Sequence, residues 1–113
     1  MTRRVSDIVK ELNLQVFSGN DKLDNPVNGA YVSDLLSDVM GNAKEGDIWI
    51  TLQTHKNIVA VASLRDIAAI ICVKGYKPDE ETLKTSIQEN IPVLGTNLPT
   101  FEVAGKLYDC LNR

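Results

Sequence analysis

The sequence predicts an α/β fold: a mostly parallel sheet with helices on both faces. The last two-thirds of the chain alternates strand-like and helix-like segments three times in succession. The connections between them are short, and such crossovers form right-handed βαβ units. One strand-like run, "IAAIICVKG", is continuously apolar, as expected of a strand that is covered on both faces. At 113 residues we expect a single domain over residues 1–113.

The first part of the chain is expected to contain two helices and two strands. A helix over Ser6–Leu12 begins with Ser6 as its cap, and "LQVFSGND" forms a strand that ends in a Gly-Asn turn. The polar segment "DKLDNPVN" is a surface loop, and Val27–Val32 is a second strand. The helix that follows is capped by Ser33, carries Asp34 in its first turn, buries Leu35, Leu36, Val39 and Met40, and ends at Gly41.

The remaining elements follow from alternation and helical spacing. "GDIWITL" alternates as a strand, "KNIVAVASL" is a short helix, and "IPVLGT" is the last strand. Asp79 caps the helix "KPDEETLKTSIQEN", in which Leu83 and Ile87 face inward. The closing helix has Pro99 at its first position and an apolar stripe of Phe101, Ala104, Tyr108 and Leu111. Trp49 is either buried under a helix or, together with Tyr31, part of a subunit interface.

Composition and charge exclude several classes of protein. The chain has 12 basic and 15 acidic residues, a net charge of −3, so a nucleic-acid binder is not expected. The pair Arg3-Arg4 is interpreted as a solvated, frayed terminus. Met1–Leu12 has no continuous apolar core typical of a signal peptide, and no apolar run reaches the roughly 18 residues of a membrane span. We expect a cytoplasmic protein in which Cys72 and Cys110 are small buried hydrophobic residues without a disulfide.

A candidate ligand site lies where the predicted parallel strands end. Ligands of open parallel sheets bind beyond the carboxyl ends of the strands, near helix N-termini. Hydroxyl, amide, imidazole and ammonium groups at that rim suit an anionic or nucleotide-like ligand, but the same residue types also form helix caps and turns. His55, the only histidine, is accordingly either a ligand contact or a polar turn residue. The candidates are Ser33, Asp34, Thr54, His55, Lys56, Asn57, Gly75, Thr96 and Asn97.

No enzyme signature is present in the sequence. The only Gly-Lys pair, Gly105-Lys106, lies inside a predicted helix and not in a phosphate-binding loop, and there is no GxGxxG. One histidine with two buried cysteines is too few for a metal site, and no GxSxG motif exposes a nucleophilic serine. We therefore expect no catalytic residue, no metal and no cofactor.

The chain resembles the DRTGG domain family. The resemblance is carried by "GAYVSDLLSDVMGNAKEGDIWITLQTHKNIVAVA" and "IPVLGTNLPTFEVAGKLY". It implies a fold similar to the N-terminal domains of HPr kinase and of the Mur ligases, and a role that is regulatory. Family members have Gly-Asp-Arg where this chain has Gln53, Thr54 and His55. They have Thr-Gly-Gly where it has Val73, Lys74 and Gly75, so that only the last glycine is kept.

The family resemblance and the rule that ligands bind beyond the carboxyl ends of parallel strands (the strand-end rule) select the same segments. In similar Mur domains, the equivalents of Ser33 and of the Gln53–Lys56 turn lie near the uridine diphosphate part of the substrate. We expect a non-catalytic regulatory or scaffold module, a homodimer formed through Trp49 or the closing helix, that senses a nucleotide-like or phosphorylated small ligand. The alternative is an accessory protein that docks to a partner in a redox or hydrogenase assembly.

Overall fold

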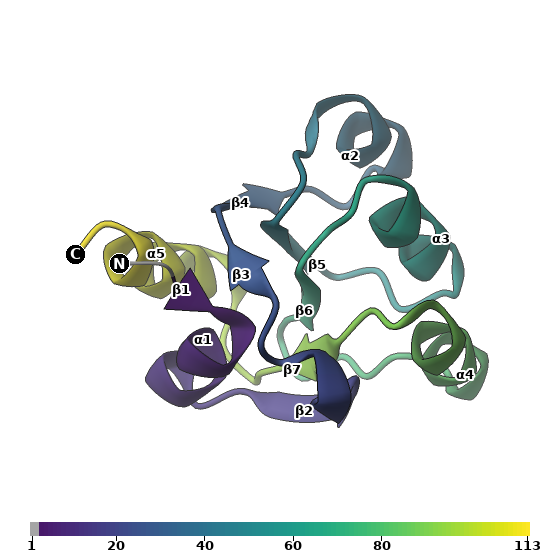
Figure 1. The fold of residues 1–113 in the computed structure, drawn as a ribbon, viewed down its shortest axis with the longest axis horizontal. Coiled ribbons are helices and arrows are strands. Elements are labelled where there is room, and N and C mark those ends of the chain that lie inside the picture. Colours follow the sequence, from purple (N-terminus) through teal and green to yellow (C-terminus); the bar gives the residue numbers. More distant parts are fainter. Residues whose placement is uncertain (1–2) are drawn as a thin grey trace.

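The computed structural model describes residues 3–113 and confirms the α/β class (Figure 1). Met1 and Thr2, at which the predicted domain begins, lie outside the described residues. No helix of the described part is long and apolar enough to cross a membrane. The elements are β1 (Arg3–Arg4), α1 (Val5–Leu12), β2 (Gln15–Ser18), a 3-10 turn (Asn20–Lys22), β3 (Pro26–Val27), β4 (Gly29–Val32), α2 (Leu36–Asn42), β5 (Asp47–Thr51), α3 (Asn57–Leu64), β6 (Ala69–Cys72), α4 (Glu80–Glu89), β7 (Val93–Gly95) and α5 (Thr100–Leu111).

The main sheet has five strands in the order β2-β7-β6-β5-β4. Strands β4 to β7 run parallel to one another, and β2 pairs antiparallel with β7 at one edge. Strand β4 forms the other edge, where the described chain provides no further strand. The fold is therefore a set of βαβ crossovers closed by one antiparallel strand, as a mostly parallel sheet requires.

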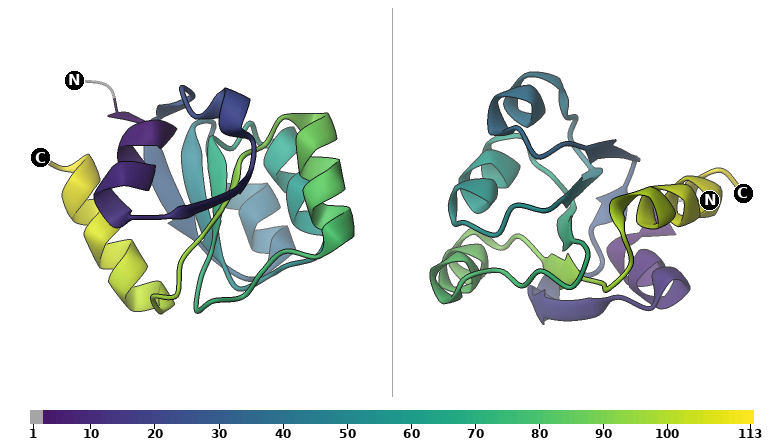
Figure 2. Two further views of the ribbon diagram at one scale, coloured as in Figure 1. Left: turned by 90° about the horizontal axis from the view of Figure 1, so that it is seen from below. Right: turned by 180° about the vertical axis from the view of Figure 1, so that it is seen from behind.

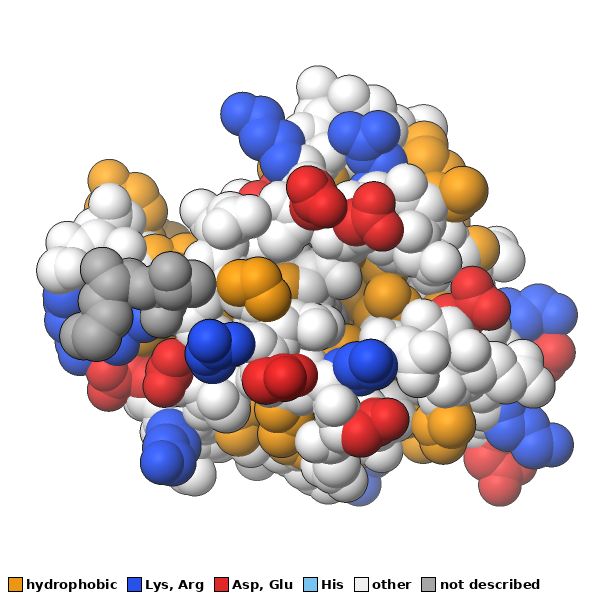
Figure 3. Space-filling view, in the orientation of Figure 1, with side chains coloured by type: hydrophobic (Ala, Val, Ile, Leu, Met, Phe, Trp, Pro, Cys, Tyr) orange, Lys and Arg blue, Asp and Glu red, His pale blue; other side chains and the backbone are white. Residues whose placement is uncertain are grey.

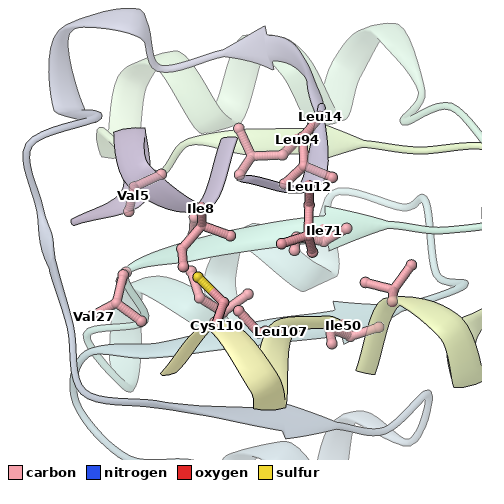
Figure 4. Packing of buried hydrophobic residues seen from close by; sticks show 14 of the residues in the cluster. Val5, Ile8, Leu12, Leu14, Val27, Ile50, Ile71, Leu94, Leu107 and Cys110 are labelled. Atoms are coloured by element: carbon pink, nitrogen blue, oxygen red, sulfur yellow. The ribbon is translucent and has the colours of Figure 1, made fainter. Parts of the chain in front are cut away.

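Helices α1 and α5 cover one face of this sheet, and α2, α3 and α4 cover the other (Figures 1 and 2). Side chains that alternate along β5 divide between the two cores: Ile48 and Ile50 pack under α1 and α5, whereas Trp49 packs under α2 and α3. In the first core, Ile8 of α1 lies beside Cys110 and Leu107 of α5, and the same core includes Ile50 and Ile71 of the sheet (Figure 4).

Two predictions about buried positions are confirmed. Every residue of β6 is buried, as its continuous apolar run predicted. Cys72 and Cys110 are both free and buried, and burial raises the pKa of the Cys72 thiol to about 12. At that pKa the thiol is protonated and unreactive at neutral pH.

The structure decides between the two alternatives for Trp49. The indole is completely buried, and its Nε1–H donates a hydrogen bond of 2.8 Å to the carbonyl of Ser33. Trp49 is therefore part of the core and takes no part in a subunit interface, and Tyr31 packs partly buried against the same core.

The N-terminal predictions were wrong in two respects. Arg3 and Arg4 are not frayed, since they form β1, which pairs antiparallel with β3, and the Arg4 guanidinium donates a hydrogen bond to the carbonyl of Asp24. Helix α1 begins at Val5, with Arg4 rather than Ser6 in the capping position. The Asp7 carboxylate accepts a hydrogen bond from the Arg4 backbone N–H at 2.9 Å, so a side chain inside the first turn closes the helix end.

The predicted strand over Val27–Val32 is two short strands, and the next helix starts later than expected. Helix α2 begins at Leu36, so Ser33 is not its cap and Asp34 is not in its first turn. Gly41 lies inside the helix and not beyond its end. Of the four residues expected to be buried, Val39 is buried and Leu36 partly so, while Leu35 and Met40 are exposed.

The inward faces of the last two helices also differ from the prediction. In α4 the buried residues are Thr82 and Ser86, whereas Ile87 is 63% exposed and Leu83 is only partly buried. The Thr82 hydroxyl donates to the carbonyl of Thr54 at 2.7 Å, and Ser86 bonds with Ser18 at 2.7 Å, so both buried hydroxyls are satisfied.

Helix α5 buries a different set of residues from the stripe that was predicted. Pro99 precedes the helix, and the buried residues are Val103, Leu107 and Cys110. Of the predicted stripe, Ala104 and Leu111 are partly buried, while Phe101 and Tyr108 are 87% and 72% exposed. These two aromatic side chains therefore lie on the outer surface of the molecule.

Candidate functional site

The predicted rim exists as one edge of the sheet. Strands β4, β5, β6 and β7 are parallel neighbours, so their carboxyl ends all lie at the same edge, which is the lower edge in the left view of Figure 2. The candidate residues follow these four strand ends, in three groups that differ in their contacts.

The first group, after β4, is occupied by internal hydrogen bonds. The Asp34 carboxylate accepts hydrogen bonds from the Thr51 hydroxyl at 2.9 Å and from the Leu52 backbone N–H at 2.7 Å. The Ser33 hydroxyl accepts one from the Leu35 N–H at 3.1 Å. The Gln53 amide donates to the carbonyl of Asp34 at 2.9 Å. These contacts tie the end of β4 to the end of β5.

The second group is the turn between β5 and α3. The carbonyl of Thr54 accepts hydrogen bonds from the Thr82 hydroxyl and from the Asp79 N–H, so this turn is fixed against α4. His55 Nδ1 lies 3.3 Å from the Asp79 carboxylate, with the imidazole 73% exposed. Lys56 Nζ lies 2.9 Å from the Glu81 carboxylate, and Asn57 begins α3. The imidazole and the ammonium group of this turn therefore each have an acidic neighbour.

The third group is formed by the ends of β6 and β7. Lys74 and Gly75 both have left-handed backbone conformations, with φ of 59° and 75°, in a tight turn closed by the Tyr76 N–H and the Val73 carbonyl. The Lys74 and Gly75 N–H groups donate to the carbonyls of Leu98 and Thr96. These two backbone donors are therefore used internally and are not free to bind an anion at this turn.

A pocket of about 430 Å³ opens beside this third group. Gly75, Thr96 and Asn97 contribute to its wall, and a Cβ added to Gly75 would lie 3.1 Å from the Asn97 side-chain oxygen. The remaining wall residues come from the end of α1, from β2, from the last residue of β7 and from the segments after β6 and β7. They are Leu12, Asn13, Gln15, Phe17, Tyr76, Lys77, Gly95 and Leu98.

The pocket joins three of the nine candidate residues with residues that sequence reasoning missed. Asn13, Gln15 and Phe17 reach it because β2 pairs antiparallel with β7 at the edge of the sheet. In the sequence, the short connection between the first helix and the single strand after it could have indicated that this strand lies at the edge of the sheet. The other six candidates, in the first two groups, do not line this pocket.

The chemical character of the pocket is mixed. Phe17 and Tyr76 supply aromatic rings, Asn13, Gln15 and Asn97 supply amides, and Lys77 supplies an ammonium group. This combination can stack against a flat ring, hydrogen-bond its edge and attract a negative charge. Within residues 3–113, no group of three or more His, Cys, Asp or Glu side chains could hold a metal ion.

The hydrogen-bonded pair of Tyr31 and Asp38, beside the first group, makes the free energy of unfolding depend on pH. The Tyr31 hydroxyl donates a hydrogen bond of 2.8 Å to Asp38, which lowers the pKa of the Asp38 carboxyl and raises the pKa of Tyr31. A lowered carboxyl pKa stabilises the fold above about pH 4, and this contribution is lost as the pH falls through the lowered value. A raised phenol pKa stabilises it below about pH 10, and this contribution is lost as the pH rises through the raised value.

We therefore expect Tyr31→Phe to be less stable than the wild type between about pH 5 and pH 9, and the difference to shrink beyond both limits. Urea unfolding of the two proteins as a function of pH measures this. Tyr76→Phe is the control, because the Tyr76 hydroxyl makes no hydrogen bond with another side chain or the backbone within residues 3–113. A difference between wild type and Tyr31→Phe that stays constant down to pH 2 would contradict the assignment.

Comparisons with known proteins agree on one family and one fold. The family model for the DRTGG domain matches residues 7–110. The chain is also similar to a solved structure of the CBS and DRTGG domains of the regulatory region of Clostridium perfringens pyrophosphatase, complexed with the activator diadenosine tetraphosphate. The TM-score is 0.73 at 18% sequence identity, over 92% of this chain and 45% of that chain. The chain thus spans less than half the length of that structure. No protein of curated function matches the sequence.

Proposed function

We propose that this chain, which belongs to the DRTGG domain family, is a non-catalytic regulatory module that binds a nucleotide-like or phosphorylated small ligand at the carboxyl ends of its strands. In this proposal residues 1–113 form one domain that acts in the cytoplasm as a homodimer. The observation that supports ligand binding is the pocket beside Gly75, Thr96 and Asn97.

The wall of the pocket supports a ligand with a flat ring and a negative charge. Phe17 and Tyr76 would contact the ring, and the amides of Asn13, Gln15 and Asn97 would hydrogen-bond its edge. Lys77 would hold a phosphate, since the Lys74 and Gly75 N–H groups are already engaged. The complex of the pyrophosphatase regulatory region with diadenosine tetraphosphate supports the choice of nucleotides as first probes.

The other six candidates form a second, separable part of the proposed rim. His55 and Lys56 have acidic neighbours at 3.3 and 2.9 Å, which reduces their attraction for an anion. Ser33, Asp34, Thr54 and Asn57 would then shape the strand ends. In this proposal they position the rim, and the contacts with the ligand are concentrated at Gly75, Thr96, Asn97 and Lys77.

A thermal-shift screen with nucleotides, dinucleoside polyphosphates, uridine diphosphate sugars and inorganic phosphate tests the proposal. A ligand at about 100 times its Kd should stabilise the wild type by roughly 2.7 kcal/mol, a shift of several degrees for a domain of this size. We expect Asn97→Ala and Lys77→Ala to reduce the shift and His55→Ala, the matched control on the same rim, to leave it unchanged.

Two outcomes would redirect the interpretation. A shift that is lost in His55→Ala but kept in Asn97→Ala would move the site to the turn between β5 and α3. The absence of a shift with every probe would overturn the ligand proposal. Copurification with a protein partner would then favour the alternative of an accessory protein that docks to a partner in a redox or hydrogenase assembly.

A further inference from the structure

Two pockets at opposite ends of the sheet differ in charge. A pocket of about 560 Å³ lies at the amino ends of the strands, and it is lined by three carboxylates and one lysine: Glu45, Asp66, Glu89 and Lys22. Basic and acidic side chains are interspersed over this end of the molecule (Figure 3). The pocket of about 430 Å³ beside Gly75 has instead Lys77 and no Asp or Glu among the described residues of its wall. Of the two pockets, the one at the carboxyl ends is therefore suited to an anion.

The positive charge of this pocket is sufficient for one phosphate. Lys77 is the single cationic residue of the described wall, and it takes part in no ion pair within residues 3–113. The backbone N–H groups of the turn before it are engaged internally. Asp79 and Glu80 follow Lys77 after two and three residues, and the chain has a net charge of −3. A second or third phosphate would therefore meet no further cation and would be repelled.

A bulge in β2 places an aromatic ring in the same pocket. Val16 and Ser18 are in register with neighbouring residues of β7, so Phe17 between them is the extra residue of the strand. Bulges change the direction of the side chain that they carry. The Phe17 ring lies over Gly95, so close that an added Cβ would overlap it, and Tyr76 contributes a second ring to the wall. A purine offers these rings a larger stacking surface than a pyrimidine does.

The uncharged polar side chains of the pocket favour one base. Asn13, Gln15 and Asn97 are exposed and make no side-chain hydrogen bond within residues 3–113, unlike other amides of the chain. Each presents a donor beside an acceptor, which matches the N6 and N7 edge of adenine. Guanine has two adjacent acceptors there that favour a basic side chain, and cytosine has a donor that favours a carboxylate. The described wall contains no arginine and no carboxylate, so its amides fit adenine best.

We infer that this pocket binds a nucleoside monophosphate whose base is adenine, with the base against Phe17, its edge toward the carboxamides and the phosphate at Lys77. The inference rests on the proposed function and narrows it to one class of nucleotide. A volume of about 430 Å³ is near the lower end of the range for small-molecule sites, which suits one nucleoside rather than two. The four phosphates of diadenosine tetraphosphate would exceed the charge that Lys77 can balance.

Isothermal titration calorimetry with a series of nucleotides tests the inference. We expect adenosine monophosphate to bind about tenfold or more tightly than the guanosine, cytidine and uridine monophosphates. Adenosine triphosphate and diadenosine tetraphosphate should bind no more tightly than adenosine monophosphate. Equal or tighter binding of another base, or tenfold tighter binding of either polyphosphate, would overturn the inference and leave the proposed function intact. The absence of binding by every nucleotide and by inorganic phosphate would overturn both.

A comparison of adenosine monophosphate with adenosine locates the phosphate. In the wild type the phosphate should improve binding about tenfold, and Lys77→Gln should remove this advantage while leaving the binding of adenosine unchanged. Lys84→Gln is the matched control, because Lys84 is also an exposed lysine without an ion pair within residues 3–113 but lies outside the pocket wall.

The control variant should keep the full advantage of the phosphate, and circular dichroism should show both variants folded. Adenosine monophosphate that keeps its tenfold advantage in Lys77→Gln, or loses it equally in Lys84→Gln, would overturn the placement of the phosphate at Lys77.

Discussion

Replacement of Trp49 with alanine is expected to lower the free energy of unfolding by about 3–5 kcal/mol, the range for loss of a large buried aromatic side chain. Trp49 has no exposed surface and packs in the core that lies under α2 and α3. The variant also loses the hydrogen bond from the indole N–H to the carbonyl of Ser33. Small domains have a total stability of only about 5–15 kcal/mol, so this variant should be close to unfolding.

Urea unfolding followed by circular dichroism measures the effect without relying on tryptophan fluorescence. Phe101→Ala, in dilute protein, is the control, because that ring is 87% exposed and should change the free energy of unfolding by less than about 0.5 kcal/mol. Trp49→Phe should fall between the two, since it keeps most of the apolar volume and loses the hydrogen bond. A loss below about 1.5 kcal/mol in Trp49→Ala would show that the indole is not a packed part of the core.

Replacement of Gly19 with alanine is expected to lower the free energy of unfolding by about 2–4 kcal/mol. Gly19 follows β2 with a φ of +86°, a conformation that L-residues with a Cβ rarely adopt. An added Cβ would lie 2.5 Å from the Cα of Pro92, which is a backbone atom that no side-chain rotation can move away. The substitution therefore forces apart β2 and the segment before β7.

Gly41→Ala is the matched control for Gly19→Ala, and its effect should have the opposite sign. Gly41 lies inside α2 with open space around it, so alanine should stabilise the helix by about 0.5–1 kcal/mol. The midpoints of urea unfolding of both variants and of the wild type give the comparison. Equal stability of Gly19→Ala and the wild type would contradict the close approach to Pro92.

Local sequence patterns identified the helices and strands more accurately than they identified which face of each helix is buried. The closing helix was placed correctly, but its stripe of Phe101 and Tyr108 lies outside and Val103 and Leu107 lie inside. Both sets have helical spacing, and only the position of the sheet decides which set it buries. In α4, hydrophobicity favoured Ile87, but Ser86 is buried because Ser18 of a distant strand satisfies its hydroxyl.

The candidate site shows the same division. The strand-end rule selected Gly75, Thr96 and Asn97, because turn residues after parallel strands must lie at one edge of the sheet. Phe17 and Gln15, on the same pocket wall, could not be selected by that rule. They reach the wall through the antiparallel pairing of β2 with β7, a contact between segments about 80 residues apart in sequence.

The sequence by itself determined the α/β class, the order of the βαβ units and the family. These depend on local periodicity, on short connections and on motifs that the chain carries along its length. Only the tertiary structure decided that Asp34 binds the end of β5, that Trp49 is core and that Phe101 and Tyr108 face outward. The physical reason is that hydrogen-bond partners and burial depend on which distant segments come together, and spacing within one element does not specify its neighbour.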